Sequence, residues 1–134
     1  LPMICTQPET RVERGNKMIP CAGAVAELYE TLGGEGTWFG KPYAEAYAGA
    51  RRLVASLRGG EVPLGRLLAI GDGADTDIKG AFDAGIRSVY VAGSVHAASA
   101  VILGRGVAFT PASLDALFAP RPHKPIAAMT GLRW

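Results

Sequence analysis

Short apolar runs alternate along the chain with segments in which apolar residues recur at helical spacing. The helical spacing predicts helices over residues 22–32, 43–57, 75–84, 97–103 and 113–118, the last capped by Ser113. The apolar runs predict strands over residues 1–5, 37–39, 66–70, 88–91 and 107–110. Strands that alternate with helices at this spacing are typical of an α/β protein. We therefore expect a three-layer Rossmann-like parallel sheet with helices on both faces.

The pattern of apolar positions within individual segments predicts which of them are buried. Residues 66–70 are almost continuously apolar, which predicts a strand covered on both faces. Ala46, Ala50, Leu53 and Leu57 form one stripe of the predicted helix and should face the core. The polar and proline-containing segments at residues 6–20 and 120–134 are expected to be a loop and a surface tail.

Composition and charge narrow the classes of function. The 134 residues are 49% hydrophobic and 19% charged, which suits a globular domain. The net charge of +2, without a block of Lys and Arg, argues against a nucleic-acid partner. No apolar run reaches the ~18–20 residues that span a membrane, and no signal peptide is visible. Cys5 and Cys21 lack metal-ligand spacing and are expected to be reduced. A cytoplasmic location follows as the default expectation.

Three aspartates follow the predicted strand 66–70. Gly71 and Gly73 flank Asp72 and allow the backbone to turn sharply and approach a ligand. Carboxylates close together at a strand end are the hard oxygen ligands that Mg²⁺ prefers, and a cation relieves their mutual repulsion. We expect Asp72 to bind a metal and Asp77 to act as a second, positioning carboxylate. Asp75 and Thr76 can simply begin the next helix.

A lysine in a second turn, after the predicted strand 37–39, complements these acids. Lys41 follows the apolar residues 37–39 and precedes Pro42, which suits the first turn of a helix. The carboxyl ends of parallel strands meet at one edge of a sheet, so Lys41 and Asp72 should lie on the same rim. A lysine beside a metal-binding turn suits the charge of a phosphoryl group. Thr6, at another strand end, could contact phosphate or only form a turn.

Other candidate residues have simpler interpretations. Trp38, Tyr43 and Tyr47 could line a pocket near Lys41, but packing is the expected role of aromatic residues beside a helix. The isolated His96 and His123 are expected on the surface or in loops.

The stretches TQPETRVERGNKMIPCAGAVAELYE, GKPYAEAY and IGDGADTDIKGAFDAGIRSVYVAG together resemble the haloacid dehalogenase-like (HAD) superfamily of phosphatases. More narrowly, they resemble its class IIA branch, which includes nitrophenylphosphatases, phosphoglycolate phosphatases and sugar phosphatases. GKP followed by GDxxxTDxxGAxxAG is more specific than either half alone. The resemblance implies that Lys41 holds the phosphate and the nucleophilic aspartate. It also implies that Asp72 binds Mg²⁺ and that Asp77 supports it.

The chain departs from the family pattern in two places. Gln7-Pro8-Glu9 stands where the branch usually has Asn-Pro-Asp. The family's first motif, a DxDGT-like strand end with the nucleophile and the general acid, does not occur in these residues. The resemblance therefore implies a C-terminal half of the core domain. In that interpretation residues 1–20 return from the cap hinge, 21–119 form the α/β core and 120–134 form the tail.

The leading hypothesis is a Mg²⁺-dependent phosphomonoesterase that works through an aspartyl-phosphate and acts on a small phosphorylated metabolite. The chain alone is expected to have little activity, because the nucleophile is missing. An alternative is a non-catalytic module that binds phosphate and Mg²⁺ or self-associates. A half domain leaves a sheet edge unpaired, so we expect a second copy or the missing N-terminal half as partner. The turn also resembles that of P-type ATPases, but their Asn-Asp spacing and membrane spans are missing from the sequence.

Overall fold

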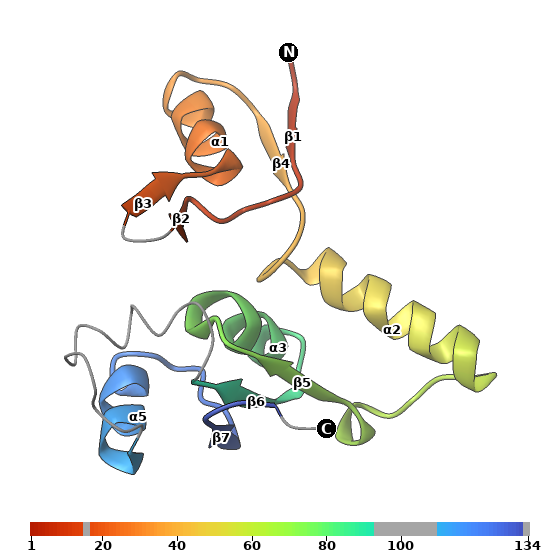
Figure 1. Cartoon of the computed structure of the whole chain (residues 1–134). Coiled ribbons are helices and arrows are strands. Elements are labelled where there is room, and N and C mark those ends of the chain that lie inside the picture. The colour runs from red at the N-terminus through yellow and green to blue at the C-terminus, as the bar shows by residue number, and fades with distance from the viewer. Residues whose placement is uncertain (15–16, 93–109, 133–134) are drawn as a thin grey trace.

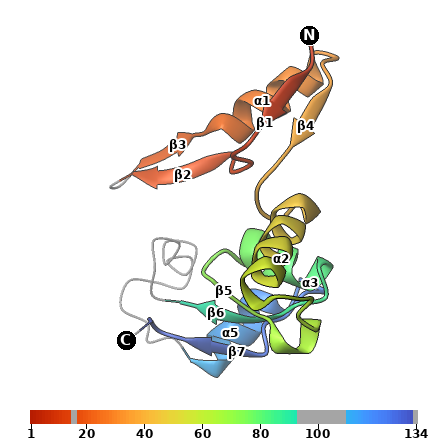
Figure 2. The same cartoon turned by 90° about the vertical axis from the view of Figure 1, so that its right-hand side faces the viewer.

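The computed structural model describes residues 1–14, 17–92 and 110–132 of the 134-residue chain. Figures 1 and 2 show two lobes, joined by a segment that leads into helix α2 (Ala44–Arg58). The predicted helix 97–103 lies outside the described residues, as does nearly all of the predicted strand 107–110. The α/β class with parallel strands is confirmed. The described strands form three small sheets, one of them an antiparallel hairpin, instead of one continuous sheet.

In the N-terminal lobe, strand β1 (Met3–Cys5) pairs in parallel with strand β4 (Gly36–Trp38). Helix α1 (Ala22–Thr31) packs on them through the fully buried Ala26. The helix approaches the preceding chain closely, since a Cβ atom on Gly23 would lie 2.4 Å from the carbonyl oxygen of Pro8. These elements agree with the predicted strands and helix to within a few residues.

The predicted loop over residues 6–20 is wrong in its second half. Strand β2 (Arg11–Arg14) pairs with strand β3 (Lys17–Pro20) as an antiparallel hairpin. Val12 lies opposite Ile19, and such pairs of β-branched residues stabilise neighbouring strands. Pairing satisfies backbone groups that a loop would leave to water.

Helix α2 confirms the prediction for residues 43–57, with its start moved to Ala44. It ends at Gly59, whose φ of 72° is the left-handed conformation that favours glycine. The predicted inward stripe is wrong, because Leu53 is 61% exposed and Leu57 is 76% exposed. The helix contacts α3 (Lys79–Asp83) instead, and none of its residues is buried.

The C-terminal lobe is built on a parallel sheet of strands β5 (Leu68–Gly71), β6 (Arg87–Val91) and β7 (Ala127–Met129), in that order. One turn of 3-10 helix (Leu64–Arg66) precedes β5. Strand β6 is central and buried in four of its five residues, as its apolar run predicts. Strand β5 is an edge strand with Leu68 and Ile70 half exposed, so the prediction of cover on both faces is wrong for β5.

The expected surface tail is also wrong, because residues 127–129 form strand β7. Ile126 donates its N–H to the carbonyl of Ser88, and Ala92 donates to the carbonyl of Met129. These bonds satisfy the edge of β6 on the side away from β5. The tail is thereby part of the sheet that carries the acidic residues.

Helices pack on this sheet around a small aromatic core. A π-helical turn (Ala74–Ile78) runs directly into α3, and together they replace the single predicted helix 75–84. Helix α5 (Pro111–Phe118) is capped by Thr110, not by Ser113; the two residues exchange reciprocal backbone bonds. Ile78, Tyr90 and Phe118 form the core cluster, with the rings of Tyr90 and Phe118 edge to face at 5.4 Å between centroids.

The substitution Phe118→Ala should lower the free energy of unfolding by about 3–5 kcal/mol, because it removes a buried ring and leaves a cavity. Phe118 is 2% exposed, whereas Phe82 on α3 is 52% exposed. The matched variant Phe82→Ala should cost only about 1–2 kcal/mol. Chemical denaturation followed by circular dichroism compares the two, and equal losses would contradict this assignment of the core.

Candidate functional site

The residues from Gly71, the last of β5, to Ile78 are called the acidic turn here. Within it the Asp77 carboxylate folds back over the backbone. Its Oδ2 accepts hydrogen bonds from the N–H groups of Asp72 at 3.2 Å and Gly73 at 2.9 Å. A Cβ atom on Gly71 would lie 2.3 Å from Asp77 Cβ, and one on Gly73 would lie 1.9 Å from Thr76 Oγ1. The two glycines therefore make room for side chains of the turn itself.

Lys41 reaches the acidic turn from the segment before α2. The peptide bond between Lys41 and Pro42 is cis. The Lys41 Nζ lies 2.5 Å from Asp77 Oδ1, so the predicted meeting of the two turns is confirmed, although the strands before them, β4 and β5, belong to separate sheets and share no rim. The hydrogen bond with Asp77 raises the pKa of Lys41, against the opposing effect of desolvation. The charges of Asp77, Glu9 and Asp72 raise it further. Lys41 is thus held protonated at the turn.

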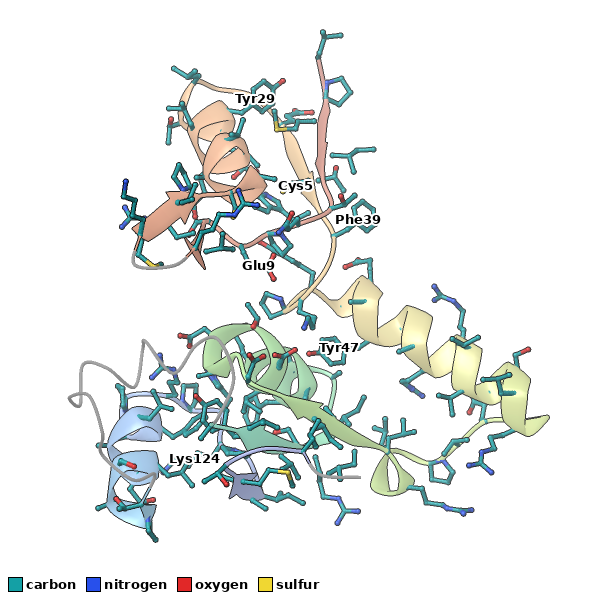
Figure 3. The ribbon with its side chains drawn as sticks, viewed as in Figure 1. Cys5, Glu9, Tyr29, Phe39, Tyr47 and Lys124 are labelled. Carbon is teal, nitrogen blue, oxygen red and sulfur yellow. The ribbon has the colours of Figure 1, made fainter. Side chains whose placement is uncertain are left out.

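Asp72 lines a cleft of about 180 Å³ beside the acidic turn, here called the site cleft. Glu9 enters it from the N-terminal lobe, and Figure 3 shows Glu9 on the side of that lobe that faces the other one. Tyr90 and Arg121 line the cleft from the C-terminal lobe. The cleft is therefore built from both lobes, with carboxylates from each.

Two larger hollows, of about 250 and 380 Å³, lie at the other end of α2. They are lined by the second half of that helix and by the residues between it and β5, including Glu61 and Leu67. Neither contains a residue of the acidic turn, whereas Asp72 to Thr76 line the site cleft; Lys41 lines none of these three. Size therefore does not identify the site, and we place it by its chemistry.

Asp75 has a role that the sequence did not suggest. Its carboxylate accepts two hydrogen bonds from the guanidinium group of Arg121, both at 2.7 Å. His123 Nε2 lies 3.5 Å from Asp75 Oδ1. The hydrogen bonds from Arg121 lower the pKa of Asp75 below its ordinary value. Asp75 does begin the helical segment, but it also anchors the residues that lead into β7.

Several predicted positions need correction or comment. His123, expected on the surface or in a loop, lies in the loop before β7 but is buried, because the tail folds into the sheet; His96 lies outside the described residues. Thr6 is exposed and is not part of the site cleft. Tyr43 stacks on Trp38 at 6.0 Å between centroids, which agrees with a packing role. Cys5 and Cys21 are free thiols.

Sequence reasoning missed Glu9, Tyr90 and Arg121 as residues of the site cleft. Glu9 carried a signal, since it belongs to the Gln-Pro-Glu that stands where the resembling family has Asn-Pro-Asp. Arg121 lies in the proline-rich tail, whose position depends on the pairing of β7 with β6. No local pattern in the sequence reveals that pairing.

The donor set suits part of a magnesium site. The described residues contain no group of three or more His, Cys, Asp or Glu side chains able to hold a metal ion. Both Asp77 oxygens already accept hydrogen bonds, one from Lys41 and the other from backbone N–H groups. Mg²⁺ commonly takes one or two carboxylates and completes its shell with waters and phosphate oxygens. Asp72 in the cleft, supported by Asp77, fits such a partial shell.

Comparisons with known proteins identify relatives of this arrangement. A family profile described as HAD-hydrolase-like matches residues 38–117, which is more than half of the chain. A haloacid dehalogenase-like hydrolase from Brucella suis 1330 is 42% identical over 99% of this chain and 45% of its own, with a TM-score of 0.72. No curated protein matches. No helix within the described residues has the length and apolar character to cross a membrane.

More distant solved structures share the fold. A possible sugar phosphatase of the HAD superfamily from Cytophaga hutchinsonii ATCC 33406 is 17% identical over 100% of this chain and 43% of its own, with a TM-score of 0.72. A p-nitrophenyl phosphatase from Archaeoglobus fulgidus is 21% identical over 96% and 42%, with a TM-score of 0.64. The chain spans less than half the length of each of these three proteins.

The pKa of Asp75 should be below 3.8 in the folded protein and should rise in the variant Arg121→Gln, which removes its hydrogen-bond partner. A carboxyl whose pKa is lowered by folding stabilises the folded state above its unfolded pKa, and this stabilisation is lost as the pH falls through the folded value. Carboxyl-carbon NMR in an acid titration measures the pKa. Arg87→Gln is the control, because Arg87 bonds to the carbonyl of Gly65 instead. An unchanged pKa in Arg121→Gln would contradict the assignment.

Proposed function

Because the chain belongs to the HAD-hydrolase-like family, we propose that it is the phosphate- and metal-holding part of a Mg²⁺-dependent phosphatase. The observation that carries the proposal is the contact between Lys41 Nζ and Asp77 Oδ1, beside Asp72 in the site cleft. A fixed cation and a carboxylate-rich turn at one rim suit a phosphate monoester and a divalent metal.

Each residue has a distinct task in this proposal. Lys41, held protonated by Asp77, neutralises charge on the phosphate group. Asp72 supplies a carboxylate oxygen to Mg²⁺, and Asp77 fixes Lys41 and the backbone of the turn. Bound Mg²⁺ would supply further positive charge for the phosphoryl oxygens. Thr6, exposed directly after β1 and outside the site cleft, is a secondary phosphate contact in this proposal.

The nucleophile is proposed to come from polypeptide outside these 134 residues. Asp77 is engaged by Lys41 and two N–H groups, and Asp72 is assigned to the metal, so neither suits an in-line attack on phosphorus. An aspartate from elsewhere would form the aspartyl-phosphate, which water then hydrolyses. In this view the chain corresponds to the C-terminal half of a core domain, with residues 1–20 returning from a cap.

The size of the site cleft supports the proposed substrate class. A volume of about 180 Å³ suits a small phosphorylated metabolite, such as a sugar phosphate or phosphoglycolate. Two of the structural relatives are described as a possible sugar phosphatase and a p-nitrophenyl phosphatase. Both descriptions concern phosphate monoesters and support the proposed reaction class.

Apolar surface supports a partner for this chain. Leu68 and Ile70 on the edge strand β5 are about half exposed. Leu53 and Leu57 on α2 are more exposed still. Large apolar side chains on an edge strand favour association. We propose that the remaining part of the parent protein, or a second copy of the chain, covers them.

A non-catalytic phosphate- and Mg²⁺-binding module is the second candidate function.

Calorimetry and a turnover assay on the 134-residue chain test these proposals together. The chain should bind Mg²⁺ in the presence of phosphate, and Asp72→Asn should weaken that binding by about tenfold or more, because a charged ligand is lost. Asp115→Asn, at an exposed position of α5, is the matched control and should bind as the wild type does.

The same chain should not hydrolyse p-nitrophenyl phosphate. Turnover that Asp72→Ala abolishes would show that the nucleophile lies within these residues and overturn that part of the proposal. A longer polypeptide that also includes the segments present in the relatives should hydrolyse the ester. If it binds Mg²⁺ and phosphate without turnover, the non-catalytic module is favoured. An absence of Mg²⁺ binding in the wild type would contradict the site itself.

A further inference from the structure

We propose that Tyr47 is a positioning residue of the candidate site, whose hydroxyl holds the acidic turn so that the Asp77 carboxylate can meet Lys41 and the turn's N–H groups together. The proposal rests on the phosphate- and metal-binding function proposed above and deepens it. Figure 3 shows Tyr47 projecting from α2 toward the lobe that carries the turn.

The first support is the hydrogen bonding of the Tyr47 hydroxyl. It donates to the backbone carbonyl of Asp77 at 2.9 Å, and the carbonyl of Thr76 lies at 3.5 Å. Both carbonyls belong to the π-helical turn Ala74–Ile78, a kind of turn that often marks functional sites. Burial raises the pKa of Tyr47 to about 12, so the hydroxyl keeps its proton and remains a donor at neutral pH.

The second support is the fit of the Tyr47 ring. A Cβ atom on Gly80 would lie 2.4 Å from ring atom Cε2 and 2.6 Å from the hydroxyl oxygen. The ring can therefore occupy this place only because residue 80 has no side chain. The absence of a side chain at Gly80 allows α2 and α3 to approach and brings the hydroxyl to the carbonyl of Asp77.

The third support is that Lys41 and Tyr47 hold the same residue by different groups. Lys41 binds the Asp77 carboxylate, whereas Tyr47 binds the Asp77 main chain. Asp77 must direct one oxygen to Lys41 and the other to two N–H groups at once. If the backbone at Asp77 were free to shift, all of these bonds would weaken together, because each depends on the position of the Asp77 Cα atom.

Amide hydrogen exchange tests the positioning directly, without requiring a metal. In the ¹⁵N-labelled 134-residue chain, Tyr47→Phe keeps the ring and removes the hydroxyl. The amides of Asp72 and Gly73 should then exchange about five- to tenfold faster, which corresponds to the loss of one or two hydrogen bonds. Gly80→Ala, which displaces the ring with its hydroxyl intact, should have the same effect.

Tyr43→Phe is the matched control. Tyr43 stands at the start of the same helix and stacks on Trp38, and its hydroxyl makes no hydrogen bond to the described residues. Its exchange rates at Asp72 and Gly73 should equal those of the wild type. The proposal is overturned if Tyr47→Phe leaves these two rates unchanged. It is also overturned if every amide accelerates equally with the loss of global stability, since Tyr47 would then only pack.

A Mg²⁺ titration of the same samples separates this proposal from the one on which it rests. Tyr47→Phe should weaken the binding of Mg²⁺ by about tenfold, and Tyr43→Phe should leave it unchanged. If the wild type binds no Mg²⁺, the proposed metal function fails, while the exchange rates of Asp72 and Gly73 still decide the role of Tyr47. If the wild type binds and Tyr47→Phe binds equally well, the positioning role fails alone.

Discussion

The Asp77 carboxylate is the interaction on which the candidate site depends. One of its oxygens binds Lys41 from the segment before α2, and the other binds two N–H groups of its own turn. A single, largely buried side chain thus fixes both the shape of the turn and its distance from the lysine. Removing it would leave a protonated lysine and two N–H groups without their acceptor, a cost that rises as water is excluded. Lys41 precedes α2 and the turn lies at the end of β5, so a helix and a strand separate them along the chain. No contact between sequence neighbours could therefore replace the bond between Lys41 and Asp77.

This dependence explains which parts of the fold the sequence could predict. Helix α2 and strand β6 are confirmed because their patterns are local: helical spacing ended by Gly59, and an apolar run buried in the sheet. The meeting of Lys41 with the acidic turn is confirmed by their contact, but β4 and β5 lie in separate sheets, so the rule that predicted it, that parallel strands of one sheet end at one edge, does not explain it. Gly71 and Gly73, expected to let the backbone approach a ligand, make room for the side chains of Asp77 and Thr76 instead.

The errors have a common cause in pairing over long distances. Strand β7 and the buried His123 depend on the edge of β6, which is far away in the sequence. The hairpin of β2 and β3 was missed although Val12 and Ile19 offered a pattern, because polar and proline residues nearby suggested a loop. The exposed stripe at Leu53 and Leu57 shows the reverse case. Periodicity identified an apolar face correctly, but it could not say whether anything within the described residues covers that face.

The three aspartates of the turn can now be separated by what offsets each charge. Asp77 is balanced by Lys41, and Asp75 by the guanidinium group of Arg121. These are different cations, on different segments, on either side of the turn. Asp72 lines the site cleft together with Asp75 and Glu9, and its charge raises the pKa of both Lys41 and Tyr90. Repulsion among the acids is therefore relieved in at least two places by the protein itself, and a cation bound beside Asp72 would relieve it further. The cluster is less a single acidic cradle than one candidate metal ligand with two structural neighbours.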